Sequence, residues 1–291
     1  MKLDVQTLEE YGSVLLKLKM YPYFDIAHYI LMCLAVREDI QTYQSTIPNF
    51  HKRHPLACYL SSMILCFGGG ILVHFLLGEP ILEDFKHHQN LVLATACWYL
   101  VFFSPFDTIY KLIKLKPVKI TLSVLKELQR SRKIYDGVNH GFHLYPNSFI
   151  IIVVCGAIKG AGSGFLTIIE RFNRGIYLPN TNETLHPSFA TKGCLLAAIA
   201  FTLERKDLLN VSKAAMFFGV ATIFVYVKVM SIFFKSFDPI VPFENLSSAV
   251  FFGGIMDALR KASRNQSAVN QKTKENKNDQ ASVDVDSKKI N

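Results

Sequence analysis

The chain has 291 residues, of which 50% are hydrophobic and 19% charged, and its mean hydropathy is +0.23. This composition is too apolar for an ordinary soluble domain and is typical of a helical membrane protein. The formal net charge of +9 is spread over loops and a C-terminal tail, which indicates basic cytoplasmic loops rather than a nucleic-acid-binding domain. The six cysteines lie in apolar runs without a C-x-x-C pair, so we predict neither a disulfide framework nor a metal site.

The first membrane helix is predicted within residues 11–36, where Pro22 interrupts an apolar helical pattern. We expect Asp25 to cap the apolar half that follows, and His28 lies one turn further on. A structural role for this pair within a helix bundle is favoured, with ion coordination as the alternative. The first ten residues are polar and acidic, so we predict no cleavable signal peptide, and the first membrane helix would target the chain.

The second span, predicted at about 56–77, has three consecutive glycines near its centre. They allow either close packing against another helix or a bend at which backbone carbonyls meet an ion or ligand. A second glycine cluster follows Lys159 in the fifth span, predicted at about 147–169. A phosphate-binding loop is excluded there because the strand–loop–helix context is absent. The hypothesis is that both clusters bend their helices, at Gly68, Gly69, Gly70, Gly160, Gly162 and Gly164.

The third span, predicted at about 90–113, is broken by Ser-Pro-Phe-Asp at 104–107. The run from 111 to 119 then carries four lysines and no acidic residue, which places that loop in the cytoplasm. Further spans predicted at about 187–203 and 211–234 bring the total to seven, once a charged fourth helix is included.

The fourth helix, predicted within 118–138, carries fixed positive charge among membrane-spanning segments. A lysine or arginine that faces lipid at mid-depth costs roughly 2.5–3.5 kcal/mol or more, so we expect its cations to face a water-filled cavity, a counter-charge or both. Glu127 is expected to point about 100° away from these cations and to offset only one charge. Viewed along the helix axis, four cations fall within an arc of about 60° on one face of this helix: Lys119, Lys126, Arg130 and Lys133.

The spans group into two sets of three helices, because the two glycine clusters occupy the second helix of each set. A set of three membrane helices ends on the opposite side of the membrane from its start. The second set must therefore have the inverted orientation. We predict inverted repeats at about 11–113 and 117–203 and an added seventh helix, in an all-α membrane domain covering 1–235. The basic loops place the N-terminus in the lumen or outside and the C-terminus in the cytosol. We expect 236–291 to be a cytosolic, largely disordered polar tail.

Short motifs occur in order between about residues 20 and 235. They include H-P-L-A at 54–57, F-G-G-G at 67–70, L-G-E-P at 77–80, P-x-D-x-x-Y at 105–110, P-V-K at 117–119, K-E-x-x-R-x-x-K-I-x-x-G-V at 126–138, Y-P-N at 145–147, K-G-A-G at 159–162 and T-K at 191–192. In number and order these motifs resemble those of the trimeric intracellular cation channels of the endoplasmic and sarcoplasmic reticulum.

The resemblance implies a homotrimer of seven-helix subunits, each with its own pore. It implies that the pore conducts monovalent cations, potassium in particular, as counter-ions during calcium release. It also implies that Lys126 and Arg130 hold the phosphates of a phosphoinositide, phosphatidylinositol bisphosphate, and we place Gly70 at the same lipid site. No covalent cofactor is implied.

Such a cation path needs its positive stripe to be neutralised. Unit charges ~6 Å apart repel by roughly 3 kcal/mol at an effective dielectric near 20. Anionic lipid phosphates are suited to cancel this repulsion. We expect the glycine bends to form the narrow middle of the pore. The charged residues assigned to the pore are Lys119, Lys133, Glu127 and Lys159.

The chain ends in K-K-I-N, and Lys288 and Lys289 resemble the dilysine retrieval signal of endoplasmic reticulum membrane proteins. Two alternatives to a channel are open. A secondary transporter of an anionic substrate also fits inverted repeats, broken helices and a basic stripe. An enzyme would depend on His140, His143 and Asp136, but nothing orders them as nucleophile, base and orienting group, so we do not predict one.

Overall fold

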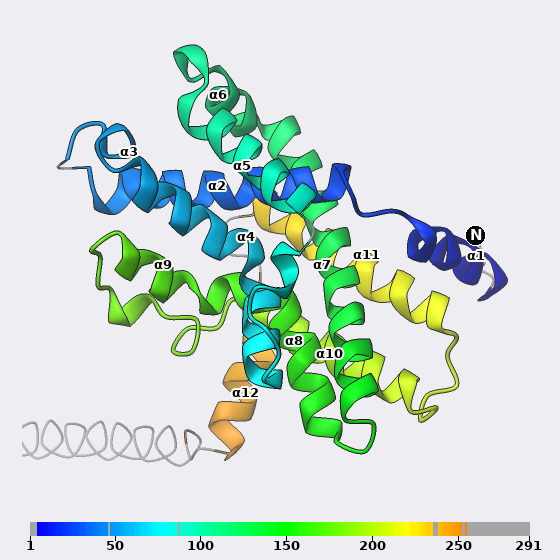
Figure 1. The fold of residues 1–291 in the computed structure, drawn as a ribbon. Coiled ribbons are helices and arrows are strands. Elements are labelled where there is room, and N and C mark those ends of the chain that lie inside the picture. The colour runs from blue at the N-terminus through cyan, green and yellow to red at the C-terminus, as the bar shows by residue number, and fades with distance from the viewer. Residues whose placement is uncertain (1–4, 46, 87, 235–237, 252–253, 255–291) are drawn as a thin grey trace, which may run out of the picture. The chain divides into compact units, whose positions relative to one another are not determined.

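The computed structural model describes residues 5–45, 47–86, 88–234, 238–251 and 254 (Figure 1). The predicted retrieval signal, Lys288 and Lys289, lies outside these residues. Within them every regular element is a helix, as predicted. The chain divides between Asp238 and Pro239 into two units, which are described separately.

The first unit is a succession of helices joined by short connections (Figure 1). They are α1 (Val5–Lys17), α2 (Tyr23–Tyr43), α3 (Phe50–Arg53), α4 (Pro55–Leu77), the 3₁₀ turn η1 (Glu83–Phe85), α5 (His88–Phe103), η2 (Pro105–Asp107), α6 (Thr108–Lys114), α7 (Lys116–Leu144), α8 (Phe149–Phe165), α9 (Thr167–Asn173), η3 (Pro179–Thr181), α10 (Phe189–Arg205) and α11 (Lys213–Phe233).

Local sequence signals account for several of these helix ends. Pro55 occupies the first position of α4, where its missing N–H leaves no helical hydrogen bond unmade. Gly78 ends α4 in the left-handed conformation, with φ of 70°, which glycine adopts without a steric penalty. The hydroxyls of Ser148 and Ser212 cap α8 and α11 by accepting from the backbone N–H three residues on.

The first unit has two hydrophobic cores. One joins α2, α4, α5 and α6 around side chains such as Phe102 and Val101. The other joins α7, α8, α10 and α11, where the Tyr135 ring meets Phe201 and Phe217 at centroid distances of 5.6 and 6.2 Å. The long helix α7 also packs against α2, so it belongs to the second core and contacts the first.

Three helical segments of the described chain are long and apolar enough to cross a membrane, namely Pro55–Leu77, Phe149–Asn173 and Lys213–Phe233. Helices α5 and α6 form a fourth if they are one span, bent by 85° at the predicted break at 104–107. Helices α2 and α7 are long enough to cross a membrane but are not apolar enough, because they carry several charged side chains. The total of seven spans therefore stays a prediction.

One expectation near the N-terminus is confirmed and one is wrong. The segment 11–36 is two helices, as the predicted interruption at Pro22 implies, because the chain leaves the helical conformation after Lys17 and resumes it at Tyr23. Asp25 does not cap the second of them, since Pro22 occupies the N-cap position without a side-chain hydrogen bond. The Asp25 carboxylate instead accepts a hydrogen bond from Gln129 of α7.

The second unit contains α12 (Val241–Phe251). This helix falls within 236–291, which we expected to be a largely disordered tail, and it begins where Val241, Phe243 and Leu246 still supply apolar side chains. Most of the tail lies outside the described residues, so a largely disordered tail stays a prediction.

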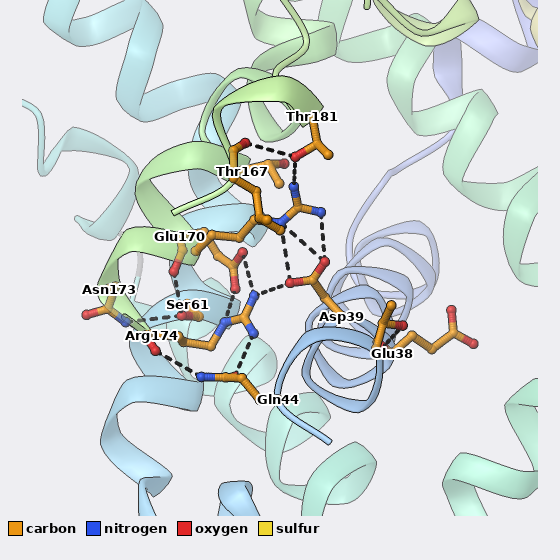
Figure 2. Close-up of polar contacts among 12 residues, drawn as sticks. Glu38, Asp39, Gln44, Ser61, Thr167, Glu170, Asn173, Arg174 and Thr181 are labelled. Carbon is orange, nitrogen blue, oxygen red and sulfur yellow. Dashed lines mark hydrogen bonds and ion pairs between the residues drawn. The ribbon is translucent and has the colours of Figure 1, made fainter. Parts of the chain in front are cut away.

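Four charged side chains form a buried cluster between α2 and α9 (Figure 2). The guanidinium of Arg174 contacts the Glu170 carboxylate at 2.6 Å and the Asp39 carboxylate at 2.5 Å. Arg171 contacts the same Asp39 at 2.7 Å. Two cations and two carboxylates leave the cluster without net charge, and it ties the end of α2 to α9.

Candidate functional site

The charged face of α7 lies against a small cavity inside the first unit. Lys126, Arg130 and Lys133 line it, together with Lys159 of α8 and His28 of α2. Its volume is about 20 Å³, which gives room for about one water molecule. The structure therefore brings three of the four predicted stripe cations, and the predicted Lys159, to one enclosed space.

A wider cavity adjoins the first and has a volume of about 130 Å³. The two share Cys66, Lys133 and Lys159 in their linings, so these residues mark the boundary between them. The wider cavity also has two carboxylates in its wall, Asp25 and Asp84. It thus combines both signs of charge, whereas the first cavity is lined by cations without a carboxylate.

Glu127 does not point away from the stripe as expected. Its carboxylate lies 2.9 Å from the guanidinium of Arg130, one helical turn further on, with both side chains largely enclosed. Residues three apart are neighbours on a helix surface, so the two charges pair within α7 itself. Neither Lys126 nor Lys159 forms an ion pair with a carboxylate of the described chain. The uncompensated charge is therefore on these lysines rather than on Arg130.

His28 lies between α4 and the stripe. Its Nε2 atom is 2.9 Å from the carbonyl oxygen of Cys66 and 3.2 Å from Nζ of Lys133. A single imidazole nitrogen either donates or accepts, so it cannot satisfy the carbonyl and a charged ammonium at once. The His28 side chain is therefore part of the cavity wall.

Lys119 is not brought to this site. It lies near the start of α7, two turns before Lys126, and lines neither cavity. Its assignment to the pore stays a prediction that these contacts do not support.

Both glycine clusters provide close contact between α4 and α8. A Cβ atom added at Gly69 would lie 2.3 Å from the carbonyl oxygen of Lys159, and one at Gly162 would lie 2.5 Å from Cα of Gly69. At Gly70 it would lie 1.5 Å from the Asp84 carboxylate, so the missing side chain admits that carboxylate to the cavity wall. The α-helical conformation continues through Gly68, Gly160 and the rest of both clusters, and their role as bends stays a prediction.

The residues considered for an enzyme do not converge. His140 contacts the Glu79 carboxylate at 2.9 Å, whereas Asp136 forms an ion pair with Arg132 at 3.2 Å. No group of His, Cys, Asp and Glu among the described residues is arranged to hold a metal ion.

Sequence reasoning missed the acidic wall of the wider cavity. Asp84 lies in the turn after α4, and only the fold places it beside Gly70. For Asp25 the sequence did indicate a polar environment, because a carboxylate within an apolar helix needs a polar partner.

Membrane-length helices around a charged interior cavity, as the described residues form them, are typical of membrane transport proteins. Comparisons with known proteins narrow this class. The family described as "TRIC channel" matches residues 44–235. The "Trimeric intracellular cation channel type 1B.1" of Caenorhabditis elegans is 46% identical over 279 residues, which cover 94% of each chain.

Solved structures give the same result. A trimeric intracellular cation channel from C. elegans, determined in the absence of Ca²⁺, matches with a TM-score of 0.74 and 43% identity over 81% of this chain and 100% of that one. A structure reported as the "structural basis for activity of TRIC counter-ion channels in calcium release" matches with a TM-score of 0.71 and 31% identity, over 77% and 98% of the two chains. The chain belongs to the TRIC channel family, which is a family of ion channels and not of enzymes.

Proposed function

We propose that the chain is an intracellular cation channel that carries potassium-type monovalent cations as counter-ions during calcium release. Two facts support this function. Its relatives are named trimeric intracellular cation channels, and one solved relative is described as a counter-ion channel in calcium release. The cavities inside the first unit supply a candidate path that needs no second subunit.

The observation that carries the proposal is a set of interior cations without enough carboxylates to balance them. Lys126 lines the narrow cavity, and Lys159 lies at its boundary with the wider one. Left uncompensated, these charges would repel a passing cation. In our proposal, a phosphoinositide such as phosphatidylinositol bisphosphate binds Lys126 and Arg130, with Gly70 nearby, and its phosphates neutralise the path.

The proposal extends to assembly and location. Each subunit would have seven membrane spans within 1–235, arranged as inverted repeats at about 11–113 and 117–203 with a seventh helix at about 211–234. Three subunits would form a homotrimer with a separate pore in each protomer. The protein would lie in the endoplasmic or sarcoplasmic reticulum membrane, with a luminal N-terminus, a cytosolic C-terminus and retrieval through Lys288 and Lys289.

The test combines planar-bilayer recording with a lipid-binding measurement on the purified full chain. Lys126→Ala removes an interior cation that has no carboxylate partner, so binding of phosphatidylinositol bisphosphate should fall about tenfold or more, and channel activity should change with it. Arg130→Ala should also weaken lipid binding, because it removes the second proposed phosphate ligand. Lys116→Ala is the matched control, since it removes an exposed lysine of the same helix that lines neither cavity.

The outcomes separate the alternatives. Wild-type currents and lipid binding in both Lys126→Ala and Arg130→Ala would contradict the lipid-neutralised path. A carrier of an anionic substrate would give no unitary current steps, whereas a channel gives them.

A further inference from the structure

A second basic site lies on the surface of the first unit, away from the interior path. It is a groove of about 340 Å³ between α1, α7 and α11. Its wall shares no lining residue with either interior cavity. Its lining includes Ser13, Leu16, Lys17, Arg132, Tyr135 and Lys213.

The groove is formed by close docking of α1. A Cβ atom at Gly12 would lie 2.0 Å from the carbonyl oxygen of Ala214, so the two backbones are in direct contact there. Arg132 of α7 donates to the carbonyl oxygen of Leu16 at 2.7 Å, at the C-terminal end of α1. Tyr11 stacks on Phe218 of α11 with ring centroids 6.1 Å apart. These three contacts pack α1 directly against α7 and α11, so the groove has well-defined walls.

The wall carries more positive than negative charge. Three cations line it, and the ion-pair partner of Arg132 is Asp136, at 3.2 Å. Lys213 instead sits 4.9 Å from the centroid of the Tyr135 ring. It is also the first residue of α11, where the helix dipole is positive and a cation is disfavoured. An anion between Lys17 and Lys213 would offset the excess positive charge of the wall and the unfavourable helix dipole at Lys213.

The same wall is partly apolar. Leu16, Tyr135 and Ala214 lie beside the cations. From Lys213 onward, α11 is a membrane-length apolar helix that exposes side chains such as Ile223 and Tyr226 along its course. A ligand that suits both parts has a phosphate at one end and a hydrocarbon chain that continues along α11.

We propose that this groove binds an anionic phospholipid, with its phosphate between Lys17, Arg132 and Lys213 and one acyl chain along α11 past Tyr11. The lipid joins α1 to α7 and α11 from outside the bundle. It is a separate site from the interior stripe, and its occupancy requires no ion conduction.

Bromine quenching of a single tryptophan tests the site directly. The chain has one tryptophan, Trp98, in α5, so Trp98→Phe with Tyr11→Trp places the only indole beside the expected acyl chain and keeps an aromatic ring on Phe218. The full chain is reconstituted in phosphatidylcholine vesicles containing brominated phosphatidylglycerol, and in parallel with brominated phosphatidylcholine. The readout is the ratio of indole quenching by brominated phosphatidylglycerol to quenching by brominated phosphatidylcholine. We expect this quenching ratio to be about 3 or more.

Two double variants of this reporter decide the origin of the preference. Lys17→Gln with Lys213→Gln should lower the ratio to about 1, and both side chains are exposed, so the change leaves the core intact. Lys19→Gln with Lys206→Gln removes two charges that do not line the groove, and the ratio should be retained.

Three results would overturn the proposal. A ratio near 1 in the reporter shows no anionic lipid at the groove. An equal fall in both double variants shows general surface attraction. The absence of quenching by either brominated lipid shows that protein, such as a second copy of the chain, covers the groove. None of these results depends on currents, so failure here is distinguishable from failure of the proposed channel function.

Discussion

Arg174 illustrates how single residues hold this molecule together. Its side chain is fully enclosed, and it contacts two carboxylates, those of Glu170 and Asp39, while Gln44 accepts a further hydrogen bond from it at 3.1 Å. A buried ion pair adds little net stability relative to a well-packed apolar pair. Removal of one partner is different, because the other charge is then left buried without compensation.

We therefore expect Arg174→Ala to lower the free energy of unfolding by about 3–5 kcal/mol, because Glu170 would remain enclosed and unpaired. Thermal unfolding of the detergent-solubilised chain measures this. The control is Lys86→Ala, which removes an exposed ion pair with Glu83 and should change stability by about 1 kcal/mol or less. Equal stability of the two variants would show that the buried cluster does not hold α9 to α2.

Glu79 follows the end of α4 and lies between two histidines. Its carboxylate lies 2.6 Å from His74 and 2.9 Å from His140. Burial alone would raise the pKa of Glu79, but hydrogen bonds from His140 and His74, together with their charges, lower it below its ordinary value of 4.5. A depressed carboxyl pKa stabilises the fold above the pKa of the unfolded chain, and this stabilisation is lost as the pH falls through the folded pKa.

The stability difference between the wild type and Glu79→Gln should therefore be largest above about pH 5 and should shrink as the pH falls below about 4.5. Unfolding curves recorded at several pH values measure this difference. Glu83→Gln is the comparison, because it removes only an exposed ion pair with Lys86 and should change stability by about 1 kcal/mol or less. A difference that is independent of pH would mean that the Glu79 charge does not contribute.

At the scale of elements, the contact between α4 and α8 depends on glycine. Gly69→Ala places a methyl group against the carbonyl oxygen of Lys159, so we expect a loss of about 1–3 kcal/mol in the free energy of unfolding. Gly219→Ala in α11 is the matched control, because a Cβ atom there meets nothing within 4 Å. That variant should be neutral or more stable by up to about 1 kcal/mol, through its better helix propensity. Thermal unfolding of both variants tests the contrast.

The elements differ in how well sequence reasoning could predict them. Helices α10 and α11 lie within two residues of their predicted ranges, because each is one apolar run that follows a serine. The interruption between α1 and α2 was predicted from Pro22, but the number of residues that leave the helix was not. Helix α12 was not predicted because, at 11 residues, it is too short to be recognised as a membrane span.

At the scale of the whole molecule, the cations of the site were predictable and their partners were not. Lys126, Arg130 and Lys133 are conspicuous in the sequence because charge is costly inside an apolar bundle. Their surroundings depend on contacts between distant segments. Gln129 meets Asp25 across 104 residues, and His28 meets Lys133 across 105. Periodicity and composition describe one helix at a time, so they do not specify such pairs.

The narrow cavity has a consequence for how ions pass. A space for about one water is too small for a cation that keeps its hydration shell, so conduction along the proposed path would require this constriction to widen. The backbone contact between Gly69 and Lys159 resists separation of α4 from α8. Side-chain rotamers change faster and at lower cost than packed helices move. Lys133 and Lys159 both border the two cavities, so along the proposed path the orientations of these two ammonium groups would set both the width of the passage and the position of its positive charge.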